Sequence, residues 1–100
     1  DQSDHRQMRS HVLATARFDW RHDRARVLLA AMREQLTRAA ARREPTWRRL
    51  SQAERVELLY RQCPQIDRRA LREHLDTESI DRADALIDHV RRHRRILETL

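Results

Sequence analysis

The sequence predicts an all-α protein, folded as a compact bundle of four to five helices. The chain has 100 residues, no glycine and only two prolines, whereas β-hairpins usually need glycine or asparagine in their turns. Arginine, alanine and leucine dominate and favour helix. Apolar residues recur every three or four positions, which is the spacing of one helix face. The length corresponds to a single domain over residues 1–100. That domain is either a whole protein or a piece of a longer chain, since it begins at Asp1 rather than Met.

Two helices are expected in the first half of the chain. Residues 4–17 carry an i, i+4 row of apolar side chains that continues to Trp20. Residues 18–23 are less regular and are either a short break or continuous helix, because no glycine or proline interrupts them. Residues 24–43 carry the clearest apolar stripe and form the strongest predicted helix. Pro45 ends it, because the residue before a proline avoids the helical region.

Three helices are expected in the second half. Ser51 and Glu54 form a capping box that begins a helix reaching about residue 62. Asp67 caps a short helix over 68–75, with Ile66 and Leu71 placed to form a hydrophobic staple. Residues 76–79 are predicted as a tight turn before a final helix over 80–98. The predicted core consists of Trp20, Leu28, Leu29, Met32, Leu36, Val56, Leu59, Leu71, Leu75, Ile80, Ile87 and Val90.

The order of the last three helices, over residues 51–99, resembles a helix-turn-helix motif. The resemblance implies DNA binding, with the first turns of the last helix in the major groove. Those turns carry Asp81, Asp84 and Asp88 against the single Arg82, and carboxylates repel phosphates. If the chain binds DNA, we therefore expect the arginines of the second helix or of residues 91–95 to make the contacts.

All 22 basic residues are arginine, and the net charge is +6. Two explanations stay open. A GC-rich bacterial genome favours arginine codons over lysine codons. Alternatively, the guanidinium groups are selected to grip phosphates or carboxylates. The excess is largest in residues 17–44, which hold eight arginines against four acidic residues.

Two arginine-rich clusters are the candidate nucleic-acid-binding residues. One surrounds an aromatic residue that could stack on a base, and the other lies in the last helix. The alternative is that the arginines offset helix dipoles at C-termini, with the tryptophan packed in the core. The candidate residues are Arg38, Arg42, Arg43, Trp47, Arg48, Arg49, Arg91, Arg92, Arg94 and Arg95.

No catalytic residue, metal site or cofactor is predicted. Without glycine there is no loop to cradle a phosphate, and no pair of carboxylates is placed for acid–base chemistry. Cys63 has no cue for a catalytic partner and is expected to be a buried small hydrophobe. His89 and His93 have a spacing that can chelate a metal, but the remaining ligands would have to come from His74 or from an aspartate or glutamate elsewhere. We therefore expect no enzyme.

The function expected from the sequence is that of a small, non-catalytic bacterial regulatory protein that binds nucleic acid through arginine-rich helices. The alternative is a helical protein-interaction module: an adaptor, an inhibitor, an antitoxin-like protein or an accessory domain of a larger protein, with an acidic protein as partner. Of the 39% hydrophobic residues many are alanine, so the core is lean, which favours a dimer, another homo-oligomer or a hetero-complex. The lone cysteine and the lack of a long apolar run predict a cytoplasmic protein that does not enter membranes.

Overall fold

The computed structural model describes residues 2–100, with side chains from Asp23 onward. The all-α prediction is confirmed, since the described residues form helices and no strand. The elements are α1 (Gln2–Arg43), the 3-10 turn η1 (Trp47–Arg49), α2 (Gln52–Gln62), α3 (Arg68–Asp76) and α4 (Ala83–Thr99). None of these helices is both long enough and apolar enough to cross a membrane.

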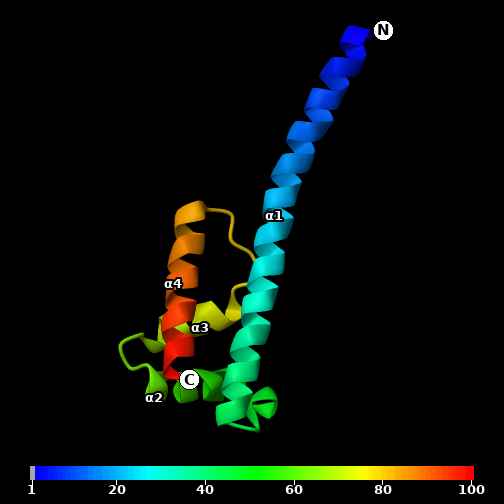
Figure 1. The fold of residues 1–100 in the computed structure, drawn as a ribbon. Coiled ribbons are helices and arrows are strands. Elements are labelled where there is room, and N and C mark those ends of the chain that lie inside the picture. Colours follow the sequence, from blue (N-terminus) through cyan, green and yellow to red (C-terminus); the bar gives the residue numbers. More distant parts are fainter. Residues whose placement is uncertain (1) are drawn as a thin grey trace.

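Helix α1 contains 42 residues and is the long axis of the molecule (Figure 1). At 1.5 Å per residue such a helix is about 63 Å long, in agreement with the longest dimension of 64 Å. The two helices expected over 4–17 and 24–43 are thus one, because nothing in residues 18–23 disfavours helix. The first half of α1 extends past the other helices, whereas its second half packs against them.

Helices α1 and α4 lie side by side and run in the same direction (Figure 1). Two contacts set this register. His93 bonds to Gln35, 58 residues earlier, and Arg43 bonds to Thr99 and Leu100, 56 and 57 residues later. The number of residues between the bonded positions is nearly constant, as expected for two parallel helices. Their C-terminal ends therefore meet at one end of the bundle, where α2 lies across them.

The two predicted N-terminal caps of the second half are confirmed. The Ser51 hydroxyl accepts from the backbone N–H of Glu54, and the Glu54 carboxylate accepts from the backbone N–H of Ser51. Asp67 accepts from the backbone N–H of Ala70 at 2.7 Å. These bonds satisfy amide groups that have no partner within the helix. They explain why α2 and α3 begin where the sequence predicts.

We expect Ser51→Ala to lower the free energy of unfolding by about 1 kcal/mol, since it removes the acceptor of the capping box. Urea unfolding followed by circular dichroism measures the change. Ser79→Ala is the matched control, because Ser79 is exposed in the extended connection between α3 and α4. An equal loss in both variants would contradict a role for the cap.

The connection between α3 and α4 differs from the prediction. Residues 77–82 are extended and replace the tight turn expected at 76–79. Helix α4 accordingly begins at Ala83 instead of 80, with Arg82 as an N-cap that makes no side-chain cap bond. The connection is longer than the three or four residues typical of a helix-turn-helix.

The core lies between the second half of α1 and the three shorter helices. Every element contributes to it, including Leu36 of α1, Trp47 of η1 and Ile96 of α4. Of the predicted core residues, Leu29, Met32, Leu36, Val56, Leu59 and Leu71 are buried, while Leu75, Ile80 and Val90 are half-buried. The Trp20 side chain lies outside the described residues.

Two predicted core residues are wrong: Leu28 is 43% exposed and Ile87 is 51% exposed. Leu28 lies about 100° around α1 from the buried Leu29, where it faces an open groove beside the start of α4 instead of the core. Ile87 lies nearly opposite the buried face of α4, which carries His89, His93 and Ile96. The apolar pattern predicts a buried face through Ile87 and Val90, because histidine counts as polar in such a pattern. The buried face instead includes the histidines.

Candidate functional site

The first of the two arginine clusters predicted from the sequence lies where the ends of α1 and α4 meet. Arg38, Arg42 and Arg43 lie in the last turns of α1, followed by Arg48 and Arg49 in η1. One Arg43 nitrogen donates to the carbonyl oxygens of Thr99 and Leu100, at 3.2 and 3.3 Å. The end of α4 is thereby fixed to the end of α1. Residues more than 50 positions apart in the sequence thus belong to one cationic end of the molecule.

Part of the positive charge at this end is neutralised. Glu34 pairs with Arg38 at 3.4 Å and with Arg48 at 3.5 Å. Arg43 offsets the negative end of the α4 dipole through its carbonyl contacts. Arg42 and Arg49 are exposed and form no ion pair with any described side chain. These two arginines are the ones that the fold leaves available for an external anion.

Trp47 does not belong to a binding surface. Its side chain is only 2% exposed, so the ring cannot stack on a base. The Arg55 guanidinium lies 5.6 Å from the ring centroid, and its Nε donates to the Trp47 carbonyl oxygen at 3.1 Å. A second Arg55 nitrogen donates to the Arg48 carbonyl oxygen. The stacking role is therefore wrong, and the alternative, a tryptophan packed in the core, is confirmed.

The arginines of α4 divide between two environments. Arg91, Arg94 and Arg95 are exposed, whereas Arg92 is half-buried. Each of the three exposed arginines is two positions from a buried residue of α4, which corresponds to about 200° around the helix axis. These arginines therefore lie opposite the buried face of α4. They form a cationic surface on the outer side of α4, one to two turns before the end that Arg43 contacts.

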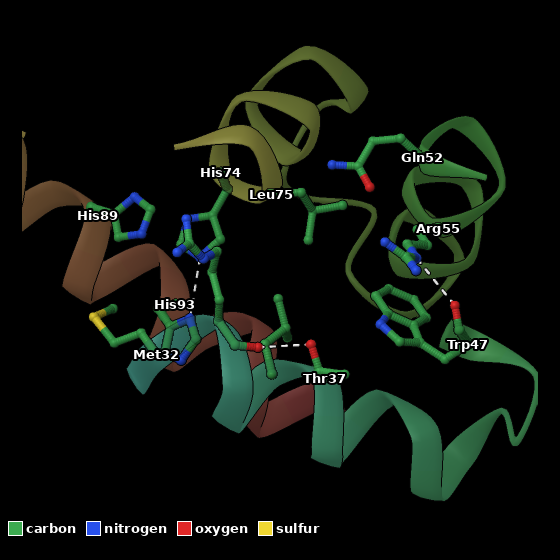
Figure 2. Close-up of a pocket in the computed structure, with 11 residues that line it drawn as sticks. Met32, Thr37, Trp47, Gln52, Arg55, His74, Leu75, His89 and His93 are labelled. Carbon is green, nitrogen blue, oxygen red and sulfur yellow. Dashed lines mark hydrogen bonds between the residues drawn. The ribbon is translucent and has the colours of Figure 1, made fainter. Parts of the chain in front are cut away.

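A cluster of three buried histidines joins α1, α3 and α4 (Figure 2). His74, His89 and His93 are each no more than 5% exposed. The His74 ring stacks on His89, with 3.9 Å between centroids and 11° between planes. The centroid of His93 lies 5.4 Å from that of His74. The cluster borders a small cavity of about 110 Å³, also lined by Met32 and Trp47.

The hydrogen bonds of the cluster define its protonation. The Gln35 side-chain oxygen can only accept, so the His93 Nε2–H donates to it at 3.1 Å. His93 Nδ1 then carries no proton and accepts from the His74 Nε2–H at 3.2 Å. This series of hydrogen bonds leaves His74 Nδ1 as a buried acceptor, with no partner among the described residues. Neutral His74 and His93 rings fit these bonds, while His89 takes part in the cluster by stacking.

Electrostatics favour the same neutral state. Burial lowers the pKa of His74 from 6.5 to about 3, assisted by repulsion from His89, His93 and Arg92. Burial likewise lowers the pKa of His89 to about 4, with smaller effects of His93 and Arg92. Burial also lowers the pKa of His93. A proton on any of these rings would lie next to an existing cation or to another imidazole without water to solvate it.

The cluster is not arranged as a metal site. Among the described side chains, no group of three or more histidine, cysteine, aspartate or glutamate residues could hold a metal ion. The stacking of His74 on His89 explains this, because parallel rings direct their nitrogen lone pairs along parallel planes and not toward one point. His74 and His93 are bonded directly to each other. The His89–His93 spacing indicated the pair in the sequence, with His74 among the possible further ligands, and the structure places His74 against both rings.

Cys63 offers no nucleophile. Its side chain is fully buried, and burial raises the pKa of the thiol. A thiolate is the reactive form of cysteine, so this position disfavours reaction. The expectation of a buried small hydrophobe is confirmed.

An open apolar groove lies on the other part of the molecule, where α1 rises past the start of α4. It has a volume of about 830 Å³. Most of its lining is apolar and comes from Ala25, Val27, Leu28, Ala31, Ile80, Ala83 and Leu86. Val27 is 68% exposed. No sequence pattern distinguished this groove from the core, because its residues belong to the same apolar stripe.

Comparison with known proteins gives this chain no relative: no protein-family model matches it, and neither a curated protein nor a solved structure is significantly similar to it.

Proposed function

We propose that the protein is a non-catalytic helical module that binds nucleic acid through the cationic end of its bundle. The observation that supports this proposal is the contact of Arg43 with the last carbonyls of α4. It fixes the end of α4 beside the arginines at the end of α1 and in η1, one to two helical turns from the exposed arginines of α4. We expect the exposed guanidinium groups of these elements to contact phosphates along one nucleic-acid chain.

The same geometry favours backbone contacts over base recognition. Trp47 is buried, and the candidate arginines are divided between the end of α1, η1 and the outer side of α4 instead of lying along one helix face. Phosphate contacts carry no sequence information. We therefore expect affinity for duplex DNA and single-stranded RNA alike, with a strong dependence on salt and a weak dependence on sequence.

Fluorescence anisotropy of labelled duplex DNA and single-stranded RNA tests this proposal at low and at physiological salt. The variant Arg42→Gln/Arg49→Gln removes two exposed arginines at the cationic end. We expect it to weaken binding and to reduce the slope of log affinity against log salt by about 2. The measurement compares both slopes on the same oligonucleotides.

The matched control is Arg69→Gln/Arg72→Gln, which removes the same charge from the exposed face of α3. If nonspecific net charge alone governs binding, both double variants will lose affinity equally. Wild-type protein that does not bind at low salt would overturn the proposal, and the arginine excess would then reflect codon usage.

A second candidate function, a protein-interaction module, is favoured by a separate observation. The groove between α1 and the start of α4 exposes several apolar side chains, and contiguous exposed apolar surface typically marks a binding site for another protein. This candidate does not require nucleic-acid binding.

A further inference from the structure

We infer that the apolar groove binds the N-terminal half of α1 from a second copy of this chain, so that two molecules associate reciprocally in antiparallel orientation through α1. This inference deepens the protein-interaction candidate and is independent of nucleic-acid binding. Three features of the molecule support it.

The first feature is the length of α1 that the chain itself does not cover. The other helices surround only the second half of α1 (Figure 1). About 20 residues precede the groove, and as a helix they span about 30 Å. The groove begins at Arg24 and lies beside the start of α4, where the covered part of α1 ends. A partner helix in the groove would therefore continue directly along the uncovered part.

The second feature is the spacing of apolar residues along α1. Leu13 and Trp20 precede the exposed Val27 at intervals of seven residues. Seven residues are close to two helical turns, so these positions share one face of α1. That face continues from the groove into the uncovered half of the helix. In a two-fold arrangement, the same face supplies both the groove and the segment that fills it.

The third feature is charge. Residues 78–88, which include one wall of the groove, contain four acidic residues against one arginine. Residues 2–22 contain four arginines against two acidic residues. An antiparallel partner would place this basic segment beside the acidic start of α4. The basic segment and the acidic region have opposite charges and attract each other. This attraction favours the N-terminal segment of a second copy as the occupant of the groove.

Sedimentation-velocity and light-scattering measurements of the full chain over a range of concentrations test the inference. We expect a concentration-dependent dimer. Val27→Glu should raise the dimer dissociation constant roughly tenfold or more, because it buries a carboxylate in an apolar contact. Val27 is 68% exposed, so the substitution leaves the monomer fold intact, which circular dichroism verifies.

Ile87→Glu is the matched control. Ile87 is exposed to a similar degree but does not line the groove, so its dimer should match the wild type. A wild-type chain that stays monomeric at all concentrations would overturn the inference. A dimer that Val27→Glu leaves unchanged would also overturn it. Neither result would affect the nucleic-acid proposal, whose variants lie at the opposite end.

Cross-linking tests the identity of the occupant. Equal amounts of Gln7→Cys protein and Ser79→Cys protein are mixed and treated with a bismaleimide; the native Cys63 is buried and serves as an internal control. A linkage between the two different variants is expected, because residue 7 of one copy would lie near the start of α4 in the other. Dimers that link only like variants would contradict the antiparallel arrangement.

Discussion

Acidification from neutral pH to about 5 is expected to lower the free energy of unfolding by on the order of 3 kcal/mol, well before the carboxylates titrate. The cause is the buried histidine cluster. The pKa of His74 falls from 6.5 to about 3 on folding, and that of His89 falls to about 4. The unfolded chain therefore binds more protons than the folded chain between these values. The folded protein has its full stability above pH 6.5, and it loses stability as the pH falls from 6.5 toward the folded-state pKa values of His74 and His89.

The size of the effect follows from the number of groups. Each histidine that is neutral in the folded state and charged in the unfolded state contributes about 1.4 kcal/mol for each pH unit below 6.5. Two such groups with pKa values of about 3 and 4 act over the same window. Since small domains are only marginally stable, acid should unfold the protein near pH 4 to 5.

Urea unfolding between pH 4.5 and 8 measures this dependence, and His89→Phe provides the matched variant. Phenylalanine retains a flat ring to stack on His74 but cannot take up a proton. We expect the slope of stability against pH to decrease by about 1.4 kcal/mol per pH unit, the share of one histidine. The variant should remain folded at pH 8. An unchanged slope would show that His89 does not titrate with the unfolding transition.

The carboxylates act in a lower window. Hydrogen bonds to Ser51, Arg68 and Arg82 lower the pKa of Glu54, Glu57 and Asp84, respectively. Their contributions are lost only as the pH falls below their ordinary values of 4.5 and 3.8. A loss of stability between pH 6.5 and 5 therefore belongs to the histidines.

Trp47→Ala is expected to unfold the protein or to lower its free energy of unfolding by about 3–5 kcal/mol, the cost of removing a large aromatic side chain from a core. Trp47 is 2% exposed and belongs to the central cluster with Leu36, Val56 and Ile96. The core of this chain is small, so neighbouring side chains cannot collapse into the space. Trp47→Phe should cost less, because it preserves part of the ring.

Urea unfolding measures both variants, and Ile87→Ala is the control because Ile87 is 51% exposed. We expect the control to change stability by no more than about 0.5 kcal/mol. The same variants discriminate between the two roles considered for Trp47. Unchanged stability combined with a loss of nucleic-acid affinity would restore the base-stacking role and contradict the buried position.

The sequence by itself determined the helical class and several element boundaries. The capping box at Ser51, the cap at Asp67 and the stop before Pro45 are local interactions between residues a few positions apart, so spacing alone identifies them. The sequence leaves open whether the first two predicted helices are one, because nothing in residues 18–23 either disrupts or favours a continuous helix. The burial of Cys63 also agrees with the prediction, since a thiol with no cue for a catalytic partner behaves as a small hydrophobe.

Only the tertiary structure decided which face of each helix is covered. Leu28 and Ile87 share the periodicity of the core but are exposed, because a helix is covered only where a neighbour lies: Leu28 faces an open groove, and Ile87 lies opposite the buried face of α4. Conversely, His74, His89 and His93 are core residues, since three helices enclose them, His74 stacks on His89, and His93 bonds to both His74 and Gln35. The contact of Arg43 with the end of α4 depends on the parallel packing of α1 and α4, which joins residues more than 50 positions apart. Such contacts depend on how whole helices pack against one another, which the spacing of residues within one helix does not specify.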